Sequence, residues 1–122
     1  MIGHMSLGVA DLECAARFYD AVLVPLGYVQ VWKNPHGAGY GTPDGNDKLA
    51  LFPQTEPSAP RPGFHVAFVA PDAAAVDAFH AAAMTSGGTD NGAPGLRADY
   101  GPRYYAAFVV DPDGYNIEAV CQ

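Results

Sequence analysis

The sequence predicts an α+β fold made of two copies of a βαβββ unit. Short apolar runs typical of strands alternate with two helical stretches, and the same order of elements occurs twice along the chain. His4 recurs as His65, 61 residues later, and the turn Pro43-Asp44-Gly45 recurs as Pro112-Asp113-Gly114, 69 residues later. A tandem repeat of one unit therefore accounts for the whole chain.

The first unit begins with a strand and a helix. Residues 2–9 alternate between apolar and less apolar side chains, as in a strand, and His4 lies on the less apolar face. Asp11 stands where its carboxylate can accept a free amide of the first helical turn, and the helix should end near Pro25. Three more strands are expected, at residues 28–32, 39–42 and 48–52.

A proline-rich segment separates the two units. Residues 53–63 contain four prolines, which can continue neither a strand ladder nor a helix. We therefore expect a single domain with module one at 1–53, a linker at 54–62 and module two at 63–122.

The second unit repeats the first with a longer connection. A strand is expected at 63–70 and an alanine-rich helix at 73–86. The glycine- and proline-rich residues 90–102 are expected to form a long loop before strands at 104–110 and 115–120.

Composition and charge narrow the possible functions. With 122 residues, of which 49% are hydrophobic, the chain has enough apolar material for one small core. Thirteen acidic against six basic residues leave a net charge of −7, which opposes binding to nucleic acid or to an anionic membrane. No signal peptide or membrane span is recognisable, so a cytoplasmic protein is expected. Cys14 and Cys121 are interpreted as unpaired thiols.

Three residues are candidates for binding a metal ion: His4, His65 and Glu118. Each lies on an expected strand next to at least one bulky apolar residue (Met5; Phe64 and Val66; Ile117), so its side chain points away from the face that packs on the helices. Two imidazoles and a carboxylate can hold a divalent metal and leave other coordination positions open. Open positions are typical of catalysis rather than of a structural metal. A hydrogen-bonded core histidine is the alternative for either histidine taken alone.

Further polar and aromatic residues are candidates for binding a substrate beside the metal: Arg97, Tyr100, Arg103, Tyr105 and Trp32. The first four lie in or just after the long second-half loop, and Tyr104 is the alternative to Tyr105. An arginine there suits an anionic group of a substrate. The competing interpretation is that the arginines are solvated and that the aromatic residues pack the sheets.

The sequence resembles the vicinal oxygen chelate superfamily, which includes glyoxalase I, extradiol dioxygenases, fosfomycin-resistance transferases and bleomycin-resistance proteins. The resemblance covers essentially the whole chain. It rests on the segments IGHMSLGVADLE at 2–13, RFYD at 17–20, PLGY at 25–28, FHVAF at 64–68 and DPDGYNIE at 111–118.

The resemblance implies that the modules form a cupped mixed sheet with helices on the outside. It also implies that His4, His65 and Glu118 bind one divalent metal ion, which could be Fe, Mn, Ni, Zn or Co. Many single-chain members are homodimers, often with sites assembled from both subunits. Glyoxalase I uses a fourth ligand, a glutamate on the last strand of the first module, and alignment of the two Pro-Asp-Gly turns places Leu49 at that position.

Together, these observations predict a metal-dependent enzyme that acts on a small substrate with adjacent oxygens. Its chemistry is expected to resemble that of a lactoylglutathione lyase or of a dioxygenase. Glu118 is expected to be a ligand first, with detachment to act as a catalytic base as a second role. The alternative is a non-catalytic protein that binds a small antibiotic or toxin and confers resistance. The intact ligand set favours the enzyme.

Overall fold

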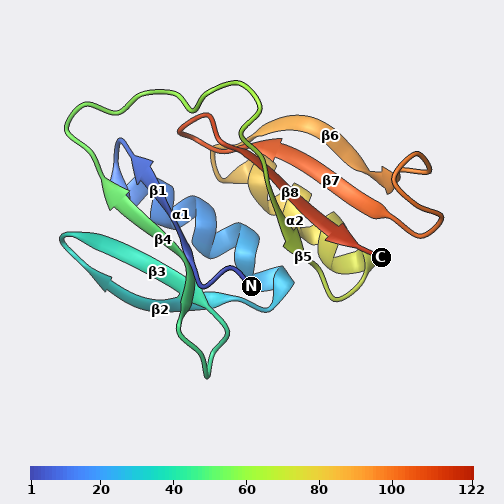
Figure 1. The fold of residues 1–122 in the computed structure, drawn as a ribbon, viewed down its shortest axis with the longest axis horizontal. Coiled ribbons are helices and arrows are strands. Elements are labelled where there is room, and N and C mark those ends of the chain that lie inside the picture. Colours follow the sequence, from blue (N-terminus) through green and yellow to red (C-terminus); the bar gives the residue numbers. More distant parts are fainter.

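The computed structural model describes all residues, 1–122, and contains two four-stranded sheets, each accompanied by one long helix (Figure 1). The first half contains β1 (Met5–Val9), α1 (Leu12–Leu23), the 3₁₀ helix η1 (Val24–Leu26), β2 (Val29–Asn34), β3 (Gly37–Gly41) and β4 (Asp47–Pro53). The second half contains β5 (Val66–Val69), α2 (Ala73–Thr85), β6 (Thr89–Leu96), β7 (Tyr105–Val110) and β8 (Asn116–Cys121). The expected α+β class and the repeated βαβββ order are confirmed.

Both sheets have the same topology. Their strand orders are β1-β4-β3-β2 and β5-β8-β7-β6. The first strand of each half runs parallel to the last strand of that half, and the remaining pairs are antiparallel. Because the orders match, each strand of one sheet has a counterpart strand in the other.

Each helix begins at an aspartate that caps it. The side chain of Asp11 accepts a hydrogen bond from the amide of Cys14 at 3.0 Å, and that of Asp72 accepts one from Ala75 at 2.8 Å. These carboxylates satisfy amides that have no partner within the first helical turn. Neither helix has the length and hydropathy of a membrane span.

The core lies between the helices and one face of each sheet. Phe18, Tyr19 and Phe79 are fully buried, and α1 packs directly on α2. Figure 1 shows the two helices as neighbours in the middle of the molecule, with a sheet toward either side. Each sheet therefore has a second face that neither helix covers, called here its open face.

The prediction of a long loop at 90–102 is wrong for the first part of that segment, because β6 forms there and pairs with β7. β6 is the edge strand of its sheet, where Pro94 can lack an amide without breaking an internal ladder. The register shifts on either side of Gly92, whose φ of 151° is accessible mainly to glycine. Only residues 97–104 remain as the loop before β7.

The turn between β7 and β8 ties the two halves together, in what is called here the turn contact. Its three hydrogen bonds run from Tyr19 Oη to Asp111 Oδ2 (2.6 Å), from the Ala10 amide to Asp113 Oδ1 (2.8 Å) and from Tyr115 Oη to the Gly8 carbonyl (2.8 Å). Asp111 is buried, and its other oxygen accepts the amides of Asp113 and Tyr115. Burial raises the pKa of Asp111, although its hydrogen bonds oppose that shift.

We predict that Tyr19→Phe lowers the free energy of unfolding by about 1–3 kcal/mol, because it leaves one oxygen of a buried carboxylate without a donor. Urea denaturation measures the effect. Tyr28→Phe is the matched control, since the Tyr28 hydroxyl makes no hydrogen bond in the fold, and it should leave the midpoint nearly unchanged. Equal losses in the two variants would contradict the role given to the Tyr19–Asp111 bond.

We also predict that the protein loses stability as the pH rises above about 10, the ordinary pKa of tyrosine. Burial raises the pKa of Tyr19 and that of Tyr40 in the folded chain, so only the unfolded chain ionises there. The stabilisation is complete below that pH and is lost above it. An ultraviolet titration of tyrosinate should show these two groups ionising together with the loss of helical circular dichroism. Their ionisation in a chain that stays folded is the contrary result.

Candidate functional site

Two of the three candidate metal ligands meet on the open face of the second sheet. Along β8, Ile117 and Ala119 belong to the core, so the side chain of Glu118 between them points to the open face. His65 directly precedes β5, in which Val66 pairs with Ile117 and Ala67 with Glu118. This register brings the imidazole beside the carboxylate.

Both oxygens of Glu118 have close partners. Its Oε2 lies 2.6 Å from His65 Nε2, and its Oε1 accepts a hydrogen bond of 2.6 Å from Tyr104 Oη. The Glu118 side chain is 4% exposed, whereas that of His65 is 42% exposed. The hydrogen bond to the carboxylate raises the pKa of Tyr104 to about 12, so this phenol is a proton donor at neutral pH.

An open hollow of about 500 Å³ lies in front of this trio. It is lined by His65, Ala67, Tyr100, Tyr104, Phe108 and Glu118. The rings of His65 and Phe108 are 5.9 Å apart, and the rings of Tyr100 and Tyr104 pack edge to face at 5.3 Å. A mostly aromatic hollow with a carboxylate and an imidazole at its base is typical of a site for a small molecule.

The structure does not bring His4 to this pair. His4 is exposed and directly precedes β1, as His65 directly precedes β5, so the two histidines occupy equivalent places in the two halves. No group of three His, Cys, Asp or Glu side chains within one chain is arranged to hold a metal ion.

The counterpart of Glu118 in the first sheet is Ala50, so the expected position, Leu49, is wrong by one residue. Ser6 pairs with Ala50 as Ala67 pairs with Glu118, and Leu49 belongs to the core. The pairing of β3 with β4 is irregular between Tyr40 and Gly41, which places one extra residue between the Pro-Asp-Gly turn and Ala50. Aligning the two turns by residue number does not allow for this extra residue. The conclusion for the site is unchanged, because alanine cannot bind a metal.

Of the expected substrate-binding residues, Tyr100 lines the hollow. Arg97 does not line it, but its guanidinium lies 5.3 Å from the centre of the Phe108 ring, which does. Arg97 donates one hydrogen bond to the Ala93 carbonyl, and its other N–H groups have no protein partner. Arg103 is exposed in the same loop and does not line the hollow.

Tyr105 lies on the other face of its sheet, where its hydroxyl donates to Asp77 of α2 at 2.7 Å. Tyr104 occupies the place in the site that was assigned to Tyr105. The two-residue alternation carries the signal: Tyr105 shares a face with the core residues Ala107 and Val109, whereas Tyr104 shares the open face with Phe108.

Trp32 lies on the open face of the first sheet rather than in the hollow. Its Nε1 donates to Asp47 at 3.1 Å, and its ring is 6.1 Å from that of Phe52. The indole covers Gly39 so closely that a side chain at that position would overlap it. Glycine at 39 therefore allows the indole to lie against the sheet.

Comparisons with known proteins place this geometry in context. The family model described as the Glyoxalase/Bleomycin resistance protein/Dioxygenase superfamily matches residues 1–119. No protein of curated function matches the sequence.

Several solved structures are similar. A glyoxalase/bleomycin resistance protein from Albidiferax ferrireducens T118 is 34% identical with a TM-score of 0.84, over 98% of this chain and 96% of that chain. A mutant of glyoxalase I from Zea mays is 26% identical with a TM-score of 0.73 over 96% of this chain, which spans 44% of that protein. A glyoxalase/bleomycin resistance protein/dioxygenase family enzyme from Burkholderia phytofirmans PsJN, at 19% identity and a TM-score of 0.72 over 98% of this chain and 96% of that chain, shares the fold.

We predict that Gly39→Ala displaces the indole of Trp32, breaks its bond to Asp47 and costs about 1–3 kcal/mol of stability. Trp32 is the only tryptophan, so intrinsic fluorescence reports on this residue alone, and its emission should shift to the red. Gly3→Ala is the control, because nothing lies near the position of its added methyl group. An unchanged emission in Gly39→Ala would mean that the indole does not lie against the sheet in solution.

Proposed function

This chain belongs to the Glyoxalase/Bleomycin resistance protein/Dioxygenase superfamily, and from that premise we propose that it is a metal-dependent enzyme acting on a small substrate with two adjacent oxygen atoms. The observation that carries the proposal is the buried carboxylate of Glu118, which meets the imidazole of His65 at the base of an open hollow. Buried charges are normally paired or coordinate a metal, and Glu118, unlike the buried Asp111, accepts no backbone amide that would stabilise its charge. No lysine or arginine pairs with Glu118.

The donors present fit a divalent metal ion. An imidazole nitrogen and a carboxylate oxygen converge within 2.6 Å, and such donors suit Fe, Mn, Ni, Zn or Co. Tyr104 holds the other oxygen of Glu118, which leaves Oε2 as the donor beside His65. Two protein donors are too few for a catalytic site, which usually has three.

We assign the third donor to His4 of a second copy of the chain, which makes the enzyme a homodimer. His4 is exposed beside the open face of the first sheet. The open faces also carry exposed apolar side chains, Phe52 on the first sheet and Val69 on the second, at 38% and 70% exposure. Contact between the open faces of two copies would cover these side chains and bring His4 to His65 and Glu118.

The residues around the hollow would have separate tasks. A bound divalent metal would polarise the two substrate oxygens as a Lewis acid. Glu118 serves as a ligand, and Tyr104 fixes its orientation through the bond to Oε1. Phe108 and Tyr100 provide aromatic surface for the substrate, and Arg97 offers free N–H donors to an anionic part of it.

The alanine at position 50, the counterpart of Glu118 in the first sheet, limits the number of metal ligands that the protein can supply. Without a fourth protein ligand there, a three-donor site keeps more positions open for substrate oxygens than a four-donor site does. Both lyase-like and dioxygenase-like chemistry use such positions. The net charge of −7 favours a small molecule over nucleic acid as substrate, and the free thiols of Cys14 and Cys121 fit a reducing compartment such as the cytoplasm.

The test is the metal content of protein purified without chelators, measured by elemental mass spectrometry. We expect about one divalent metal per chain, with the loss of most of it in His65→Ala, Glu118→Gln and His4→Ala. His80→Ala is the matched control, because His80 pairs with Asp90 at 2.9 Å away from the hollow, and it should retain the metal. Full metal content in Glu118→Gln would exclude the site, and a wild-type protein that takes up no metal would favour a non-catalytic binding protein.

Mixing His4→Ala with His65→Ala tests the assembly. If the site spans two copies, a mixed dimer has one intact site and one doubly defective site, so random exchange should restore about a quarter of the wild-type metal. If all the ligands come from one chain, mixing restores nothing. Mass spectrometry of the intact dimer under native conditions confirms that the chains have exchanged.

A further inference from the structure

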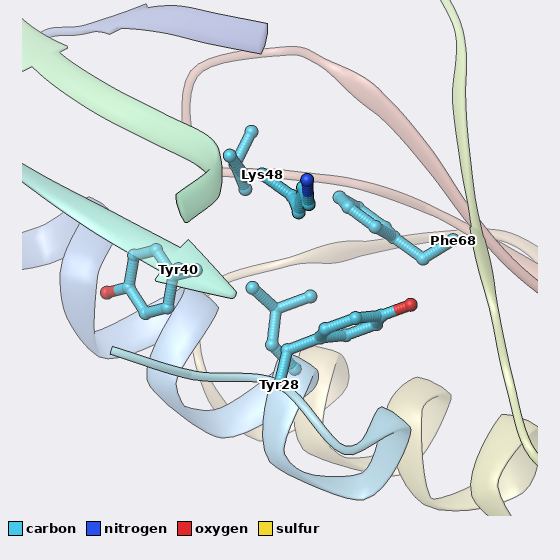
Figure 2. Close-up of a pocket in the computed structure, with 6 residues that line it drawn as sticks. Tyr28, Tyr40, Lys48 and Phe68 are labelled. Carbon is cyan, nitrogen blue, oxygen red and sulfur yellow. The ribbon is translucent and has the colours of Figure 1, made fainter. Parts of the chain in front are cut away.

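A second cavity lies between the two halves and shares no residue with the hollow. It encloses about 80 Å³. Its floor is formed by the buried residues Leu23, Tyr40 and Leu49, and its rim by the more exposed residues Tyr28, Lys48 and Phe68. Figure 2 shows Lys48, Phe68 and Tyr28 around the opening. Phe68 comes from β5 and the other five residues from the first half, so the cavity lies at the junction of the halves.

Two polar groups at the rim have no side-chain partner. The Lys48 ammonium forms no ion pair and makes only a hydrogen bond of 3.4 Å to the Gly3 carbonyl, whereas the other lysine, Lys33, pairs with Glu13 at 2.8 Å. The Tyr28 hydroxyl makes no hydrogen bond. A lysine without an ion pair at the mouth of an apolar cavity can pair with an anionic group of a ligand whose apolar part fills the cavity.

The remaining polar atom of the lining does not face the cavity. The Tyr40 hydroxyl points away from it (Figure 2) and donates to Asp20 at 2.9 Å. The interior surface is therefore made of leucine side chains and aromatic rings, with the Tyr28 and Phe68 rings 6.3 Å apart. The volume is about half of the 150 Å³ that accepts a benzene molecule in an engineered apolar cavity, which suits a small branched alkyl group.

We propose that this cavity is a binding site for a short branched-chain carboxylate. The alkyl group of the ligand lies on the floor against Leu23 and Leu49, and its carboxylate accepts hydrogen bonds from Lys48 and Tyr28. Because Phe68 belongs to the second half, a bound carboxylate contacts both halves at once. The site is independent of the metal chemistry proposed above, since the two sets of residues do not overlap.

Titration of the protein with isovalerate, followed by nuclear magnetic resonance of the backbone amides, tests this site. We expect saturable shifts at Leu23, Tyr28, Leu49 and Phe68, with the amides of His65 and Glu118 unaffected. Isoamyl alcohol, which has the same alkyl group without the charge, should bind about tenfold more weakly or worse.

Variants of the two lysines sharpen the test. Lys48→Met should weaken isovalerate binding about tenfold or more, whereas Lys33→Met, the matched control, should leave it unchanged. Lys48→Arg should restore most of the affinity, which shows that the charge is the cause. Equal binding by Lys48→Met, shifts confined to the hollow, or no saturable shift would each overturn the proposal. Circular dichroism establishes that all three variants are folded.

Discussion

The hydrogen bond from Tyr19 to the buried Asp111 is the constraint on which the relation between the two halves depends. It joins α1 of the first half to the β7–β8 turn of the second, and the bonds from Ala10 and Tyr115 strengthen the same contact. With this turn anchored, α1 and α2 pack on each other and the helices occupy the centre of the molecule. The open faces of both sheets are then free of helices, and the candidate metal ligands His65 and Glu118 meet on one of them.

The two-residue period of a strand decides which side chains reach those faces. Along β8, the core residues Ile117 and Ala119 flank Glu118 in the sequence. Along β7, the core residues Ala107 and Val109 flank Phe108, which lines the hollow. The same rule applied to the first sheet yields Gly39, covered by Trp32, and Ala50 in the place of a carboxylate. One half thus carries the acidic donor, and at the corresponding place the other half carries an alanine beside the indole of Trp32.

This alternation along individual strands explains which features of the fold and the site the sequence could predict. The repeat, the class of fold and the faces of His65 and Glu118 follow from patterns local to each strand, so they were predictable. The register of β4 and the strand at β6 were not, because an irregular pairing shifts residues without leaving a trace in the hydrophobic pattern. The alternation of side chains along β7 could have predicted that Tyr104, and not Tyr105, faces the site. The cavity beside Lys48 could not be predicted, because it forms where residues of both halves meet.

Each sheet contains strands of only one half of the chain. Every strand pair closes within residues 5–53 or within residues 66–121. The longest strand pairings inside the halves join residues 44 positions apart (Met5 and Leu49) and 51 positions apart (Val66 and Ile117). The helix packing, the turn contact and the Tyr28–Phe68 ring contact are formed across the linker. The two halves are therefore held together by helix packing and side-chain hydrogen bonds rather than by shared strands.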